Sequence, residues 1–316
     1  MRILITSAYS DPEPLRTLLQ CATHARLHQL TNDPTVADAI LFVEHSHYTQ
    51  DPFFRKLRSH PWVRDYREKT FVYNEHDRPW CFLPGLYCAM PAQHFDTHRQ
   101  AAVRYIRLLN PMVTDGHPAE EPEFLYSYIG HSHLRLRRRI VSLRHPPRAI
   151  VKDSSKFNAF YATGIQPEHH YFAEVMRRSK FILCPRGTGT SSIRLFETLK
   201  AGRVPVIIAD DWVEPDGPDW ASCSLRIRER DVAKLPAVIA NNEHAWPEMA
   251  AAARQIWTEW FSDEVLFDRF GTALEQLLEC RRIPEWIAQR VPVWREYTWA
   301  ARLAAHHVRA SMRRVL

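Results

Sequence analysis

The sequence has few glycines, no paired cysteines and no long apolar run. Nine glycines stand against 22 prolines in 316 residues, which argues against long flexible linkers. The six cysteines show no Cys-x-x-Cys pairing, and we expect them to be the reduced, buried thiols of a cytosolic protein. No stretch of about 18 apolar residues occurs, so no membrane-spanning helix is predicted.

The first residues and the net charge narrow the choice of compartment and partner. Met1–Thr6 is an apolar strand, far too short for the core of a signal peptide, so we expect a cytoplasmic protein. A net charge of +6 would suit nucleic acid, an acidic lipid surface or a nucleotide phosphate. The basic residues are spread along the chain, and there is no zinc-finger spacing, RNA-recognition strand motif or basic-plus-heptad region. Nucleic acid is therefore not expected as a partner.

Short apolar runs alternate with helical periodicity in the first part of the chain. Strands are predicted at 2–7, 39–43 and 70–73, and helices at 14–30 and 52–57. Residues 79–110, rich in proline, aromatics and histidine, give no assignment. The alternation predicts βαβ units around a parallel sheet.

A linker rich in proline, Asn110–Glu123, precedes a second alternation of the same kind. Strands are predicted there at 124–129, 148–152, 181–183, 204–208 and 224–227. Helices are predicted at 134–143, 167–178 and 231–240, and a further helix carries Arg194 and Glu197. From Glu243 onward we expect only helices, at 246–260, 264–281 and 293–314. The predicted fold class is α/β, with a Rossmann-like domain over 1–118, a second over 119–292 and a C-terminal helix over 293–316.

The loop after the predicted strand 181–183 has the composition of a phosphate site. Gly187-Thr-Gly-Thr-Ser-Ser192 supplies glycines, hydroxyl groups and the free N–H groups of a helix start. No lysine follows the second glycine, so this is not the Walker motif GxxxxGK[ST]. We interpret the loop as a site for a nucleoside diphosphate that is released, not for a γ-phosphate that is transferred.

Ser191, Arg194 and Glu197 follow one another at intervals of three residues and so lie along one helical face. Glu197 is too far along the helix to close a capping box with Ser191 or Ser192. We predict that Arg194 neutralises a diphosphate and that Glu197 accepts hydrogen bonds from ribose hydroxyls. The alternative is an i,i+3 ion pair between these two side chains on a solvated face.

The residues from Ser179 to Trp212 resemble the signature of the exostosin-type glycosyltransferases, glycosyltransferase family 47. In that family a Pro-Arg-Gly turn leads to Ser-x-x-Arg-x-x-Glu and then to a Gly-x-x-Pro-Val-Ile strand. The matching residues here are Pro185, Arg186, Gly187, Ser191, Arg194, Glu197, Gly202 and Pro205–Ile207. Upstream, FLYSYIGHSHLRLRRRI resembles the opening of the family's second domain, with Gly130 and Arg137 at the matching places.

The resemblance implies the GT-B architecture, in which two Rossmann-like domains face a cleft and the second domain holds the nucleotide-sugar. It implies an inverting glycosyltransferase without metal or cofactor, since a helix dipole and basic side chains stabilise the departing diphosphate. The implied substrates are a nucleotide-sugar, with UDP as the first choice, and a hydroxyl of a glycan or glycolipid. The candidate donor-binding residues are Gly130, Arg137, Lys152, Arg186, Gly187, Thr188, Ser191, Ser192, Arg194 and Glu197. For Lys152 the alternative is a solvated lysine at a strand end.

Inversion in one displacement needs a general base that deprotonates the acceptor hydroxyl. We expect it at the carboxyl ends of the N-terminal strands, where the crevice of such a sheet lies. Asp77 is the first choice and His76 the second; the other candidates are Asp11, Glu44 and His45. For most of them an ordinary polar loop residue is the alternative.

No metal site is predicted. Asp210-Asp211 is not the Asp-x-Asp of metal-dependent transferases, and a polar turn at a strand end explains it better. The histidines near Glu44 and at His169-His170 have no helical HExxH or second cluster to complete a site.

The predicted C-terminal helix, 293–316, carries five arginines and two tryptophans. It would either pack across the two domains or attach the protein peripherally to an anionic membrane such as the inner membrane. Two other functions stay open: a sulfotransferase-like enzyme, although residues 7–14 lack the phosphate loop expected after its first strand, and a non-catalytic nucleotide- or glycan-binding protein. The sequence leaves the sugar, the acceptor, the base and the oligomeric state undetermined.

Overall fold

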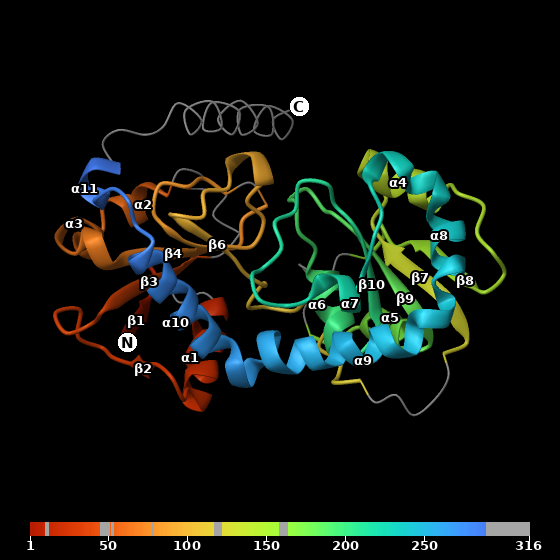
Figure 1. Ribbon diagram of the computed structural model, residues 1–316, viewed down its shortest axis with the longest axis horizontal. Coiled ribbons are helices and arrows are strands. Elements are labelled where there is room, and N and C mark those ends of the chain that lie inside the picture. Colours follow the sequence, from red (N-terminus) through yellow and green to blue (C-terminus); the bar gives the residue numbers. More distant parts are fainter. Residues whose placement is uncertain are drawn as a thin grey trace. The chain divides into compact units, whose positions relative to one another are not determined.

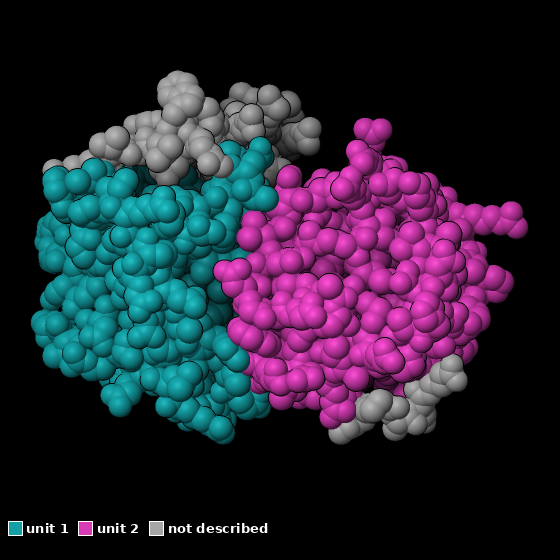
Figure 2. Space-filling view, viewed as in Figure 1, with its two compact units in different colours: residues 1–106, 263–316 teal, residues 107–262 magenta. Residues whose placement is uncertain are grey.

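The computed structural model describes residues 1–9, 13–44, 51, 54–77, 79–116, 122–157 and 164–288. The chain forms two compact units, which Figure 2 draws in different colours. Unit 1 combines Met1–Ile106 with the chain from Asp263 onward, and unit 2 is Arg107–Ser262. Each unit contains one parallel sheet with helices, so the predicted GT-B fold class is confirmed at the level of two Rossmann-like units.

Unit 1 contains six parallel strands in the order β2-β1-β3-β4-β5-β6. They are β1 Arg2–Thr6, β2 Gln29–Leu30, β3 Ala39–Glu44, β4 Thr70–Asn74, β5 Gly85–Tyr87 and β6 Gln100–Ala102. The two central strands β3 and β4 are buried along their whole length, as continuous apolar strands in a parallel sheet are. Successive strands are added on one side of β1 up to β2 and on its other side from β3 onward. The carboxyl ends of β1 and β3 therefore flank the switch point of the sheet.

β5 and β6 lie in the stretch that gave no assignment from the sequence. Each is only three residues long, too short for a periodicity to show. Gly85 is required in β5, because a Cβ there would lie 2.0 Å from the carbonyl oxygen of Val72 on β4. These strands extend the sheet by close backbone contact instead of by a long apolar run.

The helices of unit 1 come from both ends of the chain. They are α1 Glu13–Cys21, α2 Arg55–Arg58, α3 Pro61–Asp65, α10 Asp263–Glu279 and α11 Glu285–Ala288, with short 3-10 turns at Ala22–His24, Arg67–Lys69 and Ala92–His94. The helix predicted at 14–30 is too long, since α1 ends at Cys21. The N–H groups of Arg26, Leu27 and His28 donate to the Asp268 carboxylate of α10, at 2.8, 3.2 and 3.1 Å, and so are not available to continue the helix.

The division of the chain differs from the predicted boundaries at 118 and 292. The first part of the expected linker is fixed within unit 2: Gly116 N donates to Lys200 O, and Asp115 accepts from Trp257 Nε1. Helix α10 instead packs on α1, β5 and β6 of unit 1. The buried Arg104 joins both segments of unit 1, donating to the Asp263 carboxylate and to the carbonyls of Tyr105 and Ile106. The predicted helix 293–316 lies outside the described residues.

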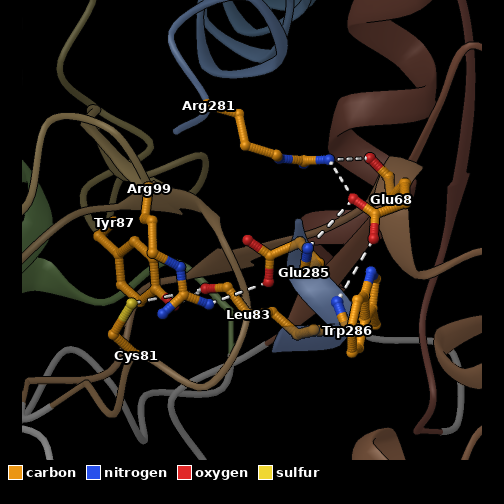
Figure 3. A network of polar contacts seen from close by, with 8 residues as sticks. All are labelled: Glu68, Cys81, Leu83, Tyr87, Arg99, Arg281, Glu285 and Trp286. Carbon is orange, nitrogen blue, oxygen red and sulfur yellow. Dashed lines mark hydrogen bonds and ion pairs between the residues drawn. The ribbon is translucent and has the colours of Figure 1, made fainter. Parts of the chain in front are cut away.

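A polar network around Glu68 fixes α11 to unit 1 (Figure 3). The Glu68 carboxylate accepts hydrogen bonds from Arg281 Nη1, at 3.1 Å, and from the backbone N–H groups of Glu285 and Trp286. The buried Glu285 carboxylate in turn accepts from Arg99 Nη2 at 3.0 Å. The chain after α10 is therefore held beside the start of β4 by charged hydrogen bonds.

Unit 2 contains five parallel strands in the order β11-β10-β9-β7-β8, and Figure 1 shows β7, β9 and β10 side by side. The strands are β7 Phe124–Gly130, β8 Ala149–Asp153, β9 Ser179–Pro185, β10 Val204–Ile208 and β11 Leu225–Arg226. The helices are α4 Arg135–Val141, α5 Pro167–Arg177, α6 Ile193–Lys200, α7 Trp220–Cys223, α8 Leu235–Asn241 and α9 Trp246–Ile256, which continues as a π-helical turn, Trp257–Phe261. The switch point of this sheet lies between β7 and β9.

All six cysteines are free thiols, and all except the partly exposed Cys280 are buried, which confirms the prediction for five of them. Burial raises the pKa of the Cys184 thiol to about 12. Among the helices that the structure describes, none has both the length and the apolar composition to cross a membrane.

We expect Asp268→Ala to lower the free energy of unfolding by about 2 to 4 kcal/mol, because three backbone N–H groups lose their shared acceptor. Urea unfolding followed by circular dichroism measures this. Glu275→Ala, an exposed position on the same helix, is the matched control and should change stability by less than about 0.5 kcal/mol. Equal effects of the two substitutions would show that Asp268 does not hold the segment after α1.

Candidate functional site

The candidate site is the loop between β9 and α6, at the switch point of the unit 2 sheet. Arg186 N donates to Ile208 O of β10 at 3.0 Å, and this bond fixes the start of the loop against the neighbouring strand. The loop ends at Ser192, the N-cap residue of α6, whose side chain makes no capping hydrogen bond. The predicted strand, loop and helix are thus confirmed in order and position.

The backbone of this loop has unused donors. Within the described part of the chain, the N–H groups of residues 188–194 donate to no carbonyl or side chain. The positive end of the α6 dipole lies at the same place. This arrangement favours an anion, which can accept several N–H hydrogen bonds at once.

Two buried hydroxyl groups in the loop also have no partner among the described residues. They are Thr190 Oγ1 and Ser191 Oγ, and the residues are 8% and 4% exposed. A buried polar atom without a hydrogen bond costs about 1 to 3 kcal/mol, so such atoms commonly serve a ligand. Thr188 is exposed, and Ser192 is half-buried.

Arg194 joins the loop helix to the carboxyl end of β7. Its Nη2 donates to Ile129 O, and its guanidinium lies 5.1 Å from the centre of the Tyr128 ring. Gly130 follows directly, and a Cβ there would lie 2.7 Å from the Tyr128 hydroxyl, which explains the glycine. These two described side chains, Arg194 and Glu197, form no ion pair, so the alternative of an i,i+3 pair is wrong.

Glu197 has a structural contact that the sequence did not suggest. Its Oε1 accepts hydrogen bonds from Leu109 N at 3.0 Å and Asn110 N at 2.8 Å. The residue is 7% exposed, and burial raises the pKa of its carboxyl group, against the opposing effects of these N–H groups and Arg194. Oε2 accepts no hydrogen bond from the described residues. One oxygen therefore fixes the start of unit 2, and the other keeps its capacity to accept a hydrogen bond.

Two arginines that we predicted to bind the donor also brace the loop. Arg186 forms a bidentate ion pair with Glu229, at 2.7 and 3.1 Å. Arg137 donates to the carbonyl oxygens of Arg186 and Pro185 at 3.0 and 3.2 Å, and Gly187 lies in the turn beside it. Their guanidinium groups hold the loop in shape, and a phosphate role for either stays a prediction.

Lys152 lies at the carboxyl end of β8. Its Nζ donates to the Tyr171 hydroxyl of α5 and lies 4.9 Å from the centre of that ring. The ammonium group is exposed, as the alternative of a solvated strand-end lysine predicts, and its nearest described partner is this tyrosine. The structure therefore does not add Lys152 to the loop site.

The candidates for a general base belong to unit 1. Asp77 is exposed in the turn after β4, and the backbone N–H of His76 donates to Asn74 Oδ1. Glu44 is buried at the switch point, where its carboxylate accepts from Ser7 Oγ and Ala8 N. Asp11 and His45 lie outside the described residues.

Sequence reasoning missed Glu229 and the role of Asp210. Glu229 N donates to Asp210 Oδ1 at 3.1 Å, and Asp210 N donates to Glu229 Oε1 at 3.3 Å. Asp210 is thus part of a strand-end contact, as the alternative to a metal site proposed. In the described ranges no group of three or more His, Cys, Asp and Glu residues has a geometry that could hold a metal ion.

Comparison with known families identifies the domain that carries this loop. The profile described as the Exostosin GT47 domain matches residues 92–241. Residues 92–241 thus match the exostosin GT47 domain. The GT47 domain starts just before β6 and ends with α8, so it includes the loop, Arg194 and Glu197. The predicted resemblance over residues 124–240 is confirmed, and the match begins earlier than we expected.

Several curated relatives share this part of the chain. The Exostosin-1 homolog of Caenorhabditis elegans is 32% identical over 116 residues, which cover 33% of this chain and 30% of that protein. A "Probable glucuronosyltransferase" of Oryza sativa subsp. japonica is 33% identical over 144 residues, 43% of this chain and 33% of that protein. The chain thus spans about a third of the length of these relatives.

Among solved structures, the chain is similar to the DNA-modifying enzyme β-glucosyltransferase. The TM-score is 0.47 and the sequence identity 11%, over 87% of this chain and 100% of that one.

We expect Glu197→Ala to lower the free energy of unfolding by about 2 to 4 kcal/mol, since Leu109 N and Asn110 N lose their acceptor. Glu197→Gln keeps an oxygen for these N–H groups and should retain most of the stability. Urea unfolding of both variants measures the difference. If alanine and glutamine destabilise the chain equally, the carboxylate charge and not the Oε1 contact fixes this segment.

Proposed function

We propose that this chain is a glycosyltransferase that moves a sugar from a UDP-sugar to a hydroxyl of a glycan or glycolipid acceptor. The observation that carries the proposal is the loop at residues 188–194, with its free N–H groups and the two buried hydroxyls without partners. These donors suit the oxygens of a diphosphate at the start of α6. The names of the GT47 relatives, a glucuronosyltransferase and a β-1,4-xylosyltransferase among them, support a sugar-nucleotide donor.

In the proposed reaction, the acceptor oxygen attacks the anomeric carbon while the bond from that carbon to the diphosphate breaks. The configuration at this carbon is inverted, and a general base takes the acceptor's proton. The N–H groups of the loop and the guanidinium of Arg194 face the charge that develops on the leaving diphosphate. Glu197 Oε2 orients the ribose. This supply of positive charge supports a reaction without a metal or other cofactor.

The exposed Asp77 remains our first candidate for the base and His76 the second, because a base must reach the acceptor hydroxyl. Both oxygens of Glu44 already accept hydrogen bonds in unit 1, which makes it a weaker candidate. The cytoplasmic location stays a prediction. So does peripheral membrane attachment, whose helix lies outside the described residues.

A non-catalytic nucleotide- or glycan-binding protein is the second candidate. A turnover assay distinguishes this binding protein from the enzyme. The assay measures release of UDP from UDP-glucuronate, UDP-xylose or UDP-glucose in the presence of a panel of glycans. The transferase should release UDP equally with and without EDTA, and NMR of the product should show the inverted anomer. Donor binding without release in any combination would favour the binding protein.

We expect calorimetry to show binding of UDP and no binding of adenosine 3′,5′-bisphosphate, which a sulfotransferase-like enzyme would prefer. Ser191→Ala and Thr190→Val should each weaken UDP binding about fivefold, because each removes one hydrogen-bond donor to the diphosphate. Their melting temperatures should not fall, since neither hydroxyl has a protein partner. Ser142→Ala, at the C-cap of α4, is the control and should bind UDP like the wild type. Unchanged UDP affinity in both loop variants would contradict the assignment of this loop.

A further inference from the structure

A hollow of about 550 Å³ lies in unit 2 at the carboxyl ends of β10 and β11. It is lined by Ala209, Asp210, Arg226, Ile227, Arg228 and Arg230, which we call the arginine pocket. Ile227 N donates to Ile207 O, so one wall is built directly on the sheet. The ion pair of Arg186 with Glu229 connects this wall to the loop after β9. The two sites therefore lie on the same edge of one sheet.

The charges of the arginine pocket favour an anion. Three arginines line it against one aspartate, so its lining carries a net positive charge. Arg226 pairs with Glu214 at 2.8 Å, and Arg230 lies 3.6 Å from Asp231. Arg228 is exposed, and its carbonyl oxygen accepts a hydrogen bond from Asp231 N, but its guanidinium forms no ion pair or hydrogen bond with any residue that the structure describes. A ligand can therefore accept hydrogen bonds from the Arg228 guanidinium without breaking an existing ion pair.

The lining also indicates which kind of anion fits. No aromatic side chain is among the described lining residues, so the pocket offers no surface for stacking a nucleotide base. The diphosphate of a nucleotide-sugar already has its hydrogen-bond donors in the loop at 188–194. A guanidinium matches a carboxylate with two parallel hydrogen bonds. Asp210 Oδ2, which accepts no hydrogen bond from the described residues, suits a sugar hydroxyl, and Ile227 offers apolar contact.

We propose that the arginine pocket binds an acidic sugar through its carboxylate, with Arg228 as the principal contact and Asp210 as the acceptor for a hydroxyl. The pocket would thus recognise a uronate unit of the glycan that this chain extends. That last assignment, of the bound sugar to the acceptor, rests on the proposed transferase function. The site itself follows from the lining alone.

The test is calorimetric titration of the full chain with sodium D-glucuronate, with D-glucose and with inorganic phosphate. Glucuronate should bind at least about tenfold more tightly than glucose, which lacks the carboxylate. Arg228→Gln should weaken glucuronate binding about fivefold to tenfold and leave UDP affinity within about twofold. Arg138→Gln, an exposed arginine of α4 outside the pocket, is the matched control and should behave as the wild type.

Three results would overturn the proposal. Equal affinity for glucose and glucuronate would remove the role of the carboxylate, and phosphate binding as tight as glucuronate binding would mark a general anion site. Loss of UDP binding in Arg228→Gln, with UDP displacing glucuronate, would make the pocket part of the donor site. Selective glucuronate binding by a wild-type chain that does not bind UDP would support the pocket and overturn only the transferase proposal.

Discussion

The hydrogen bonds from Leu109 N and Asn110 N to Glu197 Oε1 are the contact on which the arrangement of unit 2 depends. They tie the first residues of the unit to the helix that follows the candidate phosphate loop. Three residues earlier on the same helix, Arg194 donates to the carbonyl at the end of β7. Helix α6 is thus held from two sides, and its N-terminal N–H groups keep a fixed direction. Because these N–H donors are already oriented, little free energy is spent on reorganising them when an anion binds.

Unit 1 uses the same device. The buried carboxylate of Asp268 accepts three backbone N–H groups from the segment after α1, and Glu68 accepts two from the start of α11. In each case a side chain satisfies backbone donors that no strand or helix uses. This is how segments without regular structure are packed against the sheets without leaving buried N–H groups unpaired.

The polar residues at the carboxyl edge of the unit 2 sheet fall into two groups. One group is paired within the protein and holds the loops in place, and the other has unused hydrogen-bonding capacity. Arg137, Arg186 and Glu229 are occupied by one another and by loop carbonyls. Thr190, Ser191, Arg228 and Glu197 Oε2 keep hydrogen-bonding capacity that the described protein does not use. The basic residues near the candidate phosphate loop therefore differ in role. Arg137 and Arg186 hold the loop in place, and this keeps the unused hydrogen-bond donors of the loop in fixed positions.

The sequence by itself determined every strand except β2, β5 and β6, together with the parallel α/β class, the loop at 187–192 and the GT47 resemblance, because each depends on residues close together in the chain. Tertiary structure alone decided where the units begin and end, that α1 stops at Cys21, and that Arg186 pairs with Glu229. It also gave Glu197 its contact with Leu109 and Asn110. The partners in these contacts are far apart in the sequence. Arg186 and Glu229 are separated by 43 residues, Asn110 and Glu197 by 87, and His28 and Asp268 by 240. Local periodicity contains no information on such pairs, since any carboxylate can accept an N–H that the fold brings to it.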